Sequence, residues 1–312
     1  MIKNIHQPVM STEVVNHLVV ARSGTYLDAT CGFGGHTEVI LKKLNSDGKL
    51  IAMDQDQDAI NFVEGKFIDQ SRLKIIKGRF GNLKELLESN DLNFKFSGIL
   101  ADLGISSFQL DNAHRGFSFQ NKGPLDMRMD QKTGVTAQVW INNASEDEIS
   151  KVLWQFGEEK YSRKIARAII FNRMRDQIKT TQQLSEIVVD VKKNSRSKRK
   201  QHHATKTFQA IRIYINQEID QLEMFLNDSL DILKIGGRLC VISFHSLEDR
   251  MVKRFFRNHS RLDPNLSKLP NLNPEHLTDC KIVARRVKPS EEEINSNPRA
   301  RSAVLRVVEK VK

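Results

Sequence analysis

Cysteine is scarce in this chain. Only three of its 312 residues are cysteines, and they form no C-x-x-C pair and no zinc-like spacing with histidine. This scarcity argues against a disulfide framework and agrees with a reducing compartment. Long apolar runs are also lacking: none approaches the roughly 20 residues that cross a bilayer, and the first ten residues have no signal-peptide core. We therefore expect a cytoplasmic protein with no metal ion and no membrane partner.

Acidic residues are outnumbered. Lys and Arg total 49 against 38 Asp and Glu, which gives a formal net charge of +11 at pH 7. Such an excess raises the encounter rate with polyanions and makes their binding sensitive to salt. Many basic proteins bind no nucleic acid, so charge alone leaves the partner open.

The order of apolar segments predicts the fold class. The first third alternates short apolar runs with helical stretches, which is typical of a parallel sheet covered by helices. After residue 203 the pattern resumes with a long helix over 205–233 that ends at Gly236 and Gly237. About seven strands with a final hairpin-like pair resemble the methyltransferase variant of the doubly wound α/β sheet. The predicted strands are 25–29, 49–54, 73–77, 98–103, 238–244, 281–287 and 303–308.

The middle of the chain breaks this rhythm. No convincing strand occurs between residues 108 and 203, where loop-like residues lead into helices at about 146–156 and 163–173. We predict a helical domain at 109–203 inserted into a discontinuous domain of residues 1–108 and 204–312. The insertion ends in the basic run Lys192–Lys206, which we interpret as an RNA-facing segment, with a solubilising role as the alternative.

A glycine-rich turn follows the first predicted strand. Glycine in the segment Asp28–His36 allows positive φ and a close approach of backbone to a ligand. In a doubly wound sheet this turn lies at the carboxyl edge, where ligands bind. A dinucleotide fingerprint starting at Gly32 would need glycine at position 37, where Thr37 stands, so a nicotinamide cofactor is disfavoured.

Polar residues also follow the later strands. Asp54 ends the second strand, where a carboxylate can accept hydrogen bonds from both ribose hydroxyls of an adenosine-containing cofactor; a surface acid is the alternative. Phe80, after the third strand, could stack on adenine or belong to the core. Asp102 ends the fourth strand and precedes the paired Ser106 and Ser107, which makes this edge a candidate for substrate contact.

Eight sequence blocks are spread along the chain: HQPVM (6–10), DATCGFGGHT (28–37), DLGISSFQLD (102–111), RGFSF (115–119), GPLDMRMD (123–130), TFQAIRI (207–213), SFHSLEDR (243–250) and NPRARSA (297–303). Together these blocks closely resemble one family, the bacterial ribosomal RNA small subunit methyltransferase H family (RsmH/MraW). The resemblance implies a class I S-adenosylmethionine-dependent methyltransferase fold, Rossmann-like, with an inserted helical domain that recognises RNA. It also implies methyl transfer from S-adenosyl-L-methionine to N4 of cytosine 1402 in 16S rRNA, within the 30S subunit.

The same resemblance implies a set of cofactor contacts. The chain departs from the family at one position: Phe108 stands where the family usually has proline, so the φ angle of this residue is less restricted. The flanking Ser107 and Gln109 are intact. Carried over residue by residue, the cofactor contacts are Gly34, Gly35, His36, Asp54, Phe80, Asp102 and Gln109.

Methylation of an amine mainly requires alignment and a proton acceptor. Asp102 is the first candidate acceptor, with Ser106, Ser107 and Asp126 as weaker ones; alternatively Asp102 holds the amino group of the cofactor's methionine part. The base must leave its stack to reach the site. Phe117 and Phe119 could stack on it and Arg115 and Arg128 could hold phosphates, although alternating phenylalanines are more often core.

Other chemistries fit less well. Cytosine C5 methylation needs a cysteine nucleophile near the base, whereas Cys31 lies in the predicted cofactor turn and Cys240 inside a strand. His245, at a strand end, could orient substrate, but a structural role is commoner. The Asp/Asn-Pro-Pro-aromatic signature of adenine and DNA amino-methyltransferases is absent after the fourth strand. An RNA-binding protein without turnover is the remaining alternative, disfavoured by the intact polar edge.

Overall fold

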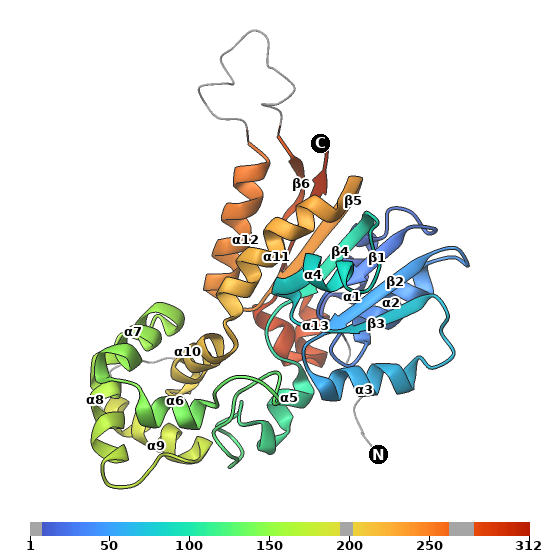
Figure 1. The fold of residues 1–312 in the computed structure, drawn as a ribbon. Helices are drawn as coiled ribbons and strands as arrows, with labels where there is room; N and C mark the ends of the chain where they lie inside the picture. The colour runs from blue at the N-terminus through green and yellow to red at the C-terminus, as the bar shows by residue number, and fades with distance from the viewer. Residues whose placement is uncertain (1–7, 194–201, 262–277) are drawn as a thin grey trace. The chain divides into compact units, whose positions relative to one another are not determined.

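A computed structural model of the chain describes residues 8–193, 202–261 and 278–312. The chain divides into two compact units, one made of residues 1–104 and 219–312 and the other of residues 105–218. Figure 1 shows the elements of each unit along the colour ramp. Among the described residues, no helix combines the length and the apolar character that crossing a bilayer requires.

The first unit is built on a seven-stranded sheet with the order β3-β2-β1-β4-β5-β7-β6. Strands β1 to β5 pair in parallel, whereas β7 is antiparallel to both β5 and β6. This order confirms the predicted fold class, including the late hairpin-like pair. The strands are β1 (Thr25–Asp28), β2 (Lys49–Asp54), β3 (Leu73–Lys77), β4 (Phe96–Asp102), β5 (Leu233–Ser243), β6 (Cys280–Val287) and β7 (Val304–Lys310).

Helices cover both faces of this sheet. Buried side chains of α4, α11 and α12 pack on one face, and those of α1 and α2 pack on the other. Successive residues of β4 show why: Ile99 and Ala101 join the first cluster, and Leu100 joins the second, because neighbouring side chains of a strand point to opposite faces. The helices are α1 (Ser11–Leu18), α2 (Gly35–Lys43), α3 (Gln57–Lys66), α4 (Leu83–Glu88), α11 (Glu218–Ile232), α12 (Ser246–His259) and α13 (Glu291–Ser296).

The second unit is helical. Its described part contains no strand, only one isolated bridge between Pro124 and Thr180. A core of Ile149, Leu153, Ile165 and similar apolar side chains joins the helices. These are α5 (Ser107–Asp111), α6 (Ala137–Asn143), α7 (Glu146–Gly157), α8 (Ser162–Arg173), α9 (Thr181–Lys192) and α10 (Thr205–Asn216).

The predicted single helix over 205–233 is wrong. The chain forms two helices, α10 and α11, because Gln217 adopts the left-handed conformation with φ 54° and ends α10. The contacts of α10 are with α6 and α7, so the resumed α/β pattern begins only at α11. Strand β5 then starts at Leu233, directly after α11, so Gly236 and Gly237 lie inside the strand rather than after a helix.

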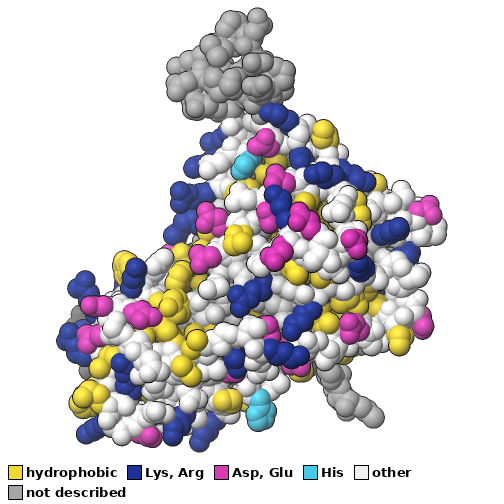
Figure 2. Space-filling model, in the orientation of Figure 1, with side chains coloured by type: hydrophobic (Ala, Val, Ile, Leu, Met, Phe, Trp, Pro, Cys, Tyr) yellow, Lys and Arg dark blue, Asp and Glu magenta, His cyan; other side chains and the backbone are white. Residues whose placement is uncertain are grey.

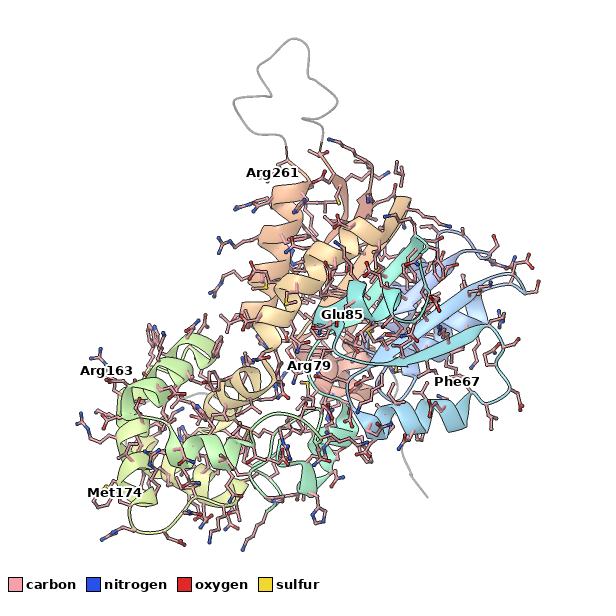
Figure 3. The ribbon with its side chains drawn as sticks, viewed as in Figure 1. Phe67, Arg79, Glu85, Arg163, Met174 and Arg261 are labelled. Atoms are coloured by element: carbon pink, nitrogen blue, oxygen red, sulfur yellow. The ribbon has the colours of Figure 1, made fainter. Side chains whose placement is uncertain are left out.

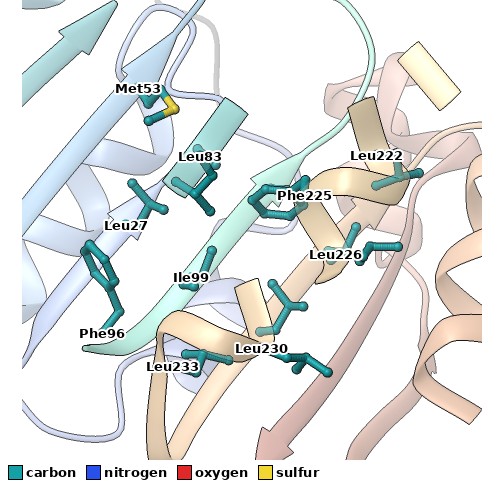
Figure 4. Packing of buried hydrophobic residues seen from close by; sticks show 14 of the residues in the cluster. Leu27, Met53, Leu83, Phe96, Ile99, Leu222, Phe225, Leu226, Leu230 and Leu233 are labelled. Atoms are coloured by element: carbon teal, nitrogen blue, oxygen red, sulfur yellow. The ribbon is translucent and has the colours of Figure 1, made fainter. Parts of the chain in front are cut away.

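Phe225 of α11 occupies the middle of the larger core of the first unit (Figure 4). Its side chain is fully buried and meets the ring of Phe80 edge-on, with 5.4 Å between ring centroids. This core sets the distance between α11 and the sheet, and it supports the turn that follows β3. Figure 4 also labels Leu27, Leu83, Ile99, Leu222 and Leu226 of the same cluster.

Truncating this side chain tests the packing. We expect Phe225→Ala to reduce the free energy of unfolding by about 3–5 kcal/mol, since removal of a buried ring leaves a cavity. Phe225→Leu, which keeps most of the apolar volume, should cost clearly less. Denaturant unfolding followed by circular dichroism measures the loss. Both tryptophans, Trp140 and Trp154, lie in the second unit, so their fluorescence reports that unit separately. A loss below about 1 kcal/mol would contradict this packing.

Candidate active site

The turn between β1 and α2 needs its glycines. Gly32 and Gly34 have positive φ values of 49° and 75°, and Gly34 is the N-cap of α2. A Cβ atom on Gly34 would stand 2.8 Å from the Phe67 ring, whereas one on Gly32 would meet nothing within 4 Å. Gly34 is therefore packed against Phe67, whereas the space beside Gly32 is open. A ligand can approach the backbone at Gly32.

Asp54 ties the end of β2 to this turn. Its Oδ2 accepts a hydrogen bond from the Gly32 N–H at 2.8 Å, and its Oδ1 accepts one from the Asp56 N–H at 2.9 Å. Burial raises the pKa of Asp54 to about 6, and these two backbone donors only partly oppose the effect. Asp56 has a different task, since it caps α3 by accepting from the Asp58 N–H. Of Asp54, Asp56 and Asp58, only Asp54 therefore lies at the end of β2.

Asp102 occupies the end of β4. Its backbone N–H donates to Thr30 Oγ1 at 2.7 Å, which ties β4 to the turn after β1. One carboxylate oxygen, Oδ2, lies 3.4 Å from His36 Nε2, an ion-pair contact. The other, Oδ1, is buried and has no hydrogen-bond partner among the described residues. A buried carboxylate oxygen without a donor is costly, so this atom is suited to a hydrogen-bond donor from a bound molecule.

His36 is the basic side chain beside Asp102 at this edge of the sheet. Its side chain is almost fully buried, and burial alone would lower its pKa. The neighbouring Asp102 carboxylate and the charge of Asp28 outweigh that effect, so the pKa of His36 is raised. The raised pKa of His36 therefore reflects the carboxylates of Asp102 and Asp28 beside it.

Asp28 was not singled out from the sequence as a site residue. Its carboxyl group is fully buried, and Oδ2 accepts a hydrogen bond from Thr37 Oγ1 at 2.7 Å. Burial raises the pKa of Asp28, with the His36 charge and the Thr37 hydroxyl opposing. Thr37, which argued against a dinucleotide fingerprint, therefore holds a buried acid beside the turn. The sequence feature that could have identified Asp28 is its position at the end of an apolar strand.

Phe80 and Gly35 complete the predicted cofactor set of the first unit. Phe80 begins a short 3-10 turn after β3, preceded by Arg79, which is labelled in Figure 3. The Phe80 ring packs partly into the core against Phe225, which agrees with the core role considered for it; stacking on adenine stays a prediction. A Cβ on Gly35 would meet Pro8 at 3.1 Å, so this position favours glycine.

Ser106, Ser107 and Gln109 belong to the second unit. Ser106 and Gln109 form a capping box at the start of α5: Gln109 N–H donates to Ser106 Oγ at 3.2 Å, and Ser106 N–H donates to Gln109 Oε1 at 2.9 Å. Phe108 follows Ser107 inside the first turn of α5, so the capping box fixes this loop where the family usually has proline.

The four predicted RNA contacts differ in their surroundings. Arg115 is only 2% exposed, and its guanidinium donates to the carbonyl oxygens of Arg128 and Met129. Phe117 is buried in the core of the second unit. Arg128 donates to both carboxylate oxygens of Asp126, at 2.7 and 2.9 Å. These three side chains are engaged within their own unit.

Phe119 is the fourth of these residues. Its ring stacks nearly parallel on the imidazole of His202, with 4.4 Å between centroids and 15° between planes. His202 therefore covers one face of the Phe119 ring, and stacking of this residue on a base stays a prediction. Lys192, at the start of the basic run, pairs with Glu159 at 2.8 Å and is buried, while residues 194–201 of that run lie outside the described residues.

The cysteines and His245 have structural surroundings. All three cysteines are buried; burial raises the pKa of Cys31 and raises the pKa of Cys240 and Cys280 to about 12, so none is poised as a thiolate. His245 is the N-cap of α12, where it and Glu248 form a capping box. Its ring therefore serves the helix start.

Comparisons with known proteins point to one family. The sequence model of the MraW methylase family matches residues 3–311. A protein of Ruthia magnifica named Ribosomal RNA small subunit methyltransferase H is 49% identical over 311 residues, covering 99% of this chain and 100% of its own. A protein of the same name from Coxiella burnetii (strain Dugway 5J108-111) is 46% identical over 306 residues, covering 98% and 99%.

Solved structures give a weaker likeness. An rRNA methylase from Streptococcus thermophilus is 12% identical, with a TM-score of 0.42 and coverage of 99% of both chains. A SAM-dependent methyltransferase from Aquifex aeolicus is 9% identical, with a TM-score of 0.40 and coverage of 97% of this chain and 90% of its own.

The raised pKa of Asp54 can be measured directly. We expect its carboxyl carbon to titrate near pH 6 in ¹³C NMR spectra of the protein without ligand. Since the native state then binds a proton that the unfolded state has lost, the contribution of Asp54 to stability is present below about pH 4 and declines as the pH rises towards 6. Asp54→Asn should remove this slope. A carboxyl signal titrating below pH 4 would contradict the buried position.

Proposed function

This chain belongs to the MraW methylase family, and we propose that it transfers a methyl group from S-adenosyl-L-methionine to N4 of cytosine 1402 in 16S rRNA. Its fold is the S-adenosylmethionine-binding fold of class I methyltransferases, and the relatives that match its full length are named for RNA of the small ribosomal subunit. The cofactor supplies an electrophilic methyl group on a sulfonium centre. The chain's residues must hold, orient and desolvate the reacting groups.

One observation carries the proposal: three strand ends of the first unit converge on a single glycine turn. Asp54 accepts from Gly32 N–H, and Asp102 N–H donates to Thr30, so the ends of β2 and β4 are both bonded to the turn after β1. This is the carboxyl edge beside the topological switch point between β1 and β4, where doubly wound sheets bind ligands.

The donor and acceptor atoms at this edge fit an adenosyl amino acid. The ionised Asp54 carboxylate would accept hydrogen bonds from the two ribose hydroxyls, with Phe80 beside the adenine. Asp102 Oδ1, buried without a partner among the described residues, would accept from the α-amino group. Gly34, Gly35 and His36 would shape the turn around the amino acid part, since α2 begins there.

Asp102 is better suited to binding than to proton transfer. Its Oδ2 already lies against His36 Nε2, and its buried Oδ1 has no hydrogen-bond partner among the described residues, which suits an N–H donor of a bound molecule. We therefore assign Asp102 to the cofactor amino group. As the N–C bond forms and the S–C bond breaks, cytosine N4 loses a proton. Ser106, Ser107 and Asp126 stay the other predicted acceptors, and of these Asp126 is already paired with Arg128.

Attack by nitrogen is favoured over attack at carbon 5. Cytosine C5 methylation requires a thiolate that adds to the ring, and all three cysteines are buried with raised pKa values. An amine acceptor needs only alignment and loss of a proton. The exocyclic N4 of cytosine supplies such an amine once the base has left its stack.

The partner we propose is 16S rRNA within the 30S subunit, met in the cytoplasm. The net charge of +11 favours a polyanion, and the stacked pair of Phe119 and His202 offers an aromatic platform for an unstacked base. Arg115, Phe117 and Arg128 lie in the helical domain predicted at residues 109–203. They would support the segment around Phe119 through the contacts described above.

Methyl transfer to ribosomal particles tests this function. With 30S subunits lacking the modification, we expect transfer from labelled S-adenosylmethionine to a single cytidine, identified as the N4-methyl form by nucleoside analysis. Asp54→Ala should weaken cofactor binding at least tenfold, because it removes the ribose acceptor. Asp102→Asn should also raise the cofactor Kd.

The result for Asp102 separates its two roles. If Asp102→Asn lowers kcat with an unchanged cofactor Kd, Asp102 is the proton acceptor instead of the amino-group ligand. Normal turnover in Asp102→Ala would exclude both roles. Label in adenine, in C5 of cytosine or in protein would contradict the proposed reaction.

A further inference from the structure

The outward face of α12 is a stripe of positive charge. Arg250, Lys253, Arg254 and Arg257 are all exposed, and exposed Arg261 follows the helix end. At 3.6 residues per turn, these positions fall within roughly 100° of the helix circumference. Figure 2 shows Lys and Arg side chains along the α12 edge of the first unit, and Figure 3 labels Arg261 at its end.

The acids of α12 do not neutralise this stripe. The helix contains two, Glu248 and Asp249. Glu248 is buried and accepts hydrogen bonds from the Phe244 and His245 N–H groups at the helix start. Asp249 binds Arg306 through both carboxylate oxygens, at 2.8 and 3.0 Å. Both negative charges are therefore engaged in the fold, away from the outward face.

The stripe is also an unfavourable arrangement for the helix itself. Like charges three or four residues apart repel, and Arg250–Arg254, Lys253–Arg257 and Arg254–Arg257 all have this spacing. Among the described residues, no ion pair joins an acid to Lys253, Arg254 or Arg257. Such repulsion is relieved when a polyanion lies along the face.

The opposite face of α12 is fixed in the core. Val252 and Phe256 are buried, and Met251 and Phe255 pack partly against the same cluster. The helix therefore cannot turn its apolar side outward, as an amphipathic helix at a membrane surface would. Its exposed face offers cations without apolar anchors, which suits phosphate groups.

The position of α12 connects this face to the proposed active site. The helix begins directly after β5, and Ile242 of β5 pairs with Asp102 of β4. The Leu103 N–H also donates to the Ile242 carbonyl oxygen at 3.0 Å. Adjacent strands lie about 4.8 Å apart, so the stripe starts beside the carboxyl edge and extends roughly 10 Å from Arg250 to Arg257.

We propose that this face, defined by Arg250, Lys253, Arg254, Arg257 and Arg261, is a docking surface for the sugar–phosphate backbone of the substrate RNA. Contacts of this kind carry no base information: they raise affinity and set the path of the strand towards the site. The inference rests on the proposed function for the identity of the RNA. It assigns the first unit a direct part in holding RNA, separate from the helical second unit.

A matched pair of triple variants tests this surface in the full-length protein. The test variant is Lys253→Gln with Arg254→Gln and Arg257→Gln. The control variant is Arg22→Gln with Lys49→Gln and Lys234→Gln, three exposed cations that precede or begin strands at the opposite edge of the sheet. Both variants lose three positive charges, so a general effect of net charge is the same in each.

We expect the α12 variant to raise the KM for 30S subunits roughly ten- to a hundredfold at 0.1 M salt, with kcat and cofactor Kd unchanged. Its plot of log affinity against log salt should be shallower by about 2–3, since each lost phosphate contact removes about 0.7–0.9 from the slope. The control should resemble the wild type. Glutamine keeps helix propensity and removes repulsion, so the α12 variant should be at least as stable as the wild type.

Equal KM values and equal salt slopes in the two variants would overturn the docking surface. Direct binding of a 16S rRNA fragment, measured alongside, keeps this result separate from the proposed reaction. If the wild type transfers no methyl group to RNA but only the α12 variant loses RNA binding, the reaction is wrong and the surface stands. If the wild type methylates RNA and both variants bind it equally, the reaction stands and the surface is wrong.

Discussion

The site depends on the hydrogen bonds that tie the turn after β1 to its neighbouring strands. Asp54 holds the Gly32 N–H from the β2 side, and Thr30 holds the Asp102 N–H from the β4 side. The Cys31 N–H also donates to the Met53 carbonyl oxygen at 2.8 Å. These bonds place two carboxylates and a glycine turn at one edge, and burial of the acids raises the pKa of Asp54 to about 6. A buried acceptor held in this way is ready for hydroxyl and amino donors before any ligand arrives.

Charge is divided along the first unit in a way that suits two different ligands. At the carboxyl edge, Asp28 and Asp102 lie beside His36, and Asp54 ends the neighbouring strand β2, which fits a cofactor with hydroxyl and ammonium groups. On α12, the acids face inward and the cations face outward, which fits a polyanion. The two surfaces meet where β5 passes into α12. Under the two proposals, one compact unit would hold a methyl donor and an RNA strand through different side chains.

Much of the fold was predictable because it follows from local patterns. Alternating apolar runs predicted six of the strands to within two residues at each end, whereas β5 begins five residues earlier than predicted. Asp54 and Asp102 lie at strand ends, as predicted. Other features depend on long-range packing. Gln217 adopts a left-handed φ, and no feature of the local sequence indicates it. The prediction therefore joined α10 and α11 into one helix. Arg115 has the composition of a surface cation but is buried by contacts with residues 128 and 129. The stripe on α12 becomes visible only once Val252 and Phe256 show which face is buried.

A crystal structure with S-adenosylhomocysteine bound tests the central claim most directly. The account predicts both ribose hydroxyls within about 3.2 Å of the Asp54 carboxylate, and the amino group at Asp102 Oδ1. It also predicts that the turn from Gly32 to Gly34 keeps the positive φ values seen without ligand. An adenosyl group bound elsewhere on the chain, or ribose hydroxyls that contact no carboxylate of this edge, would contradict it.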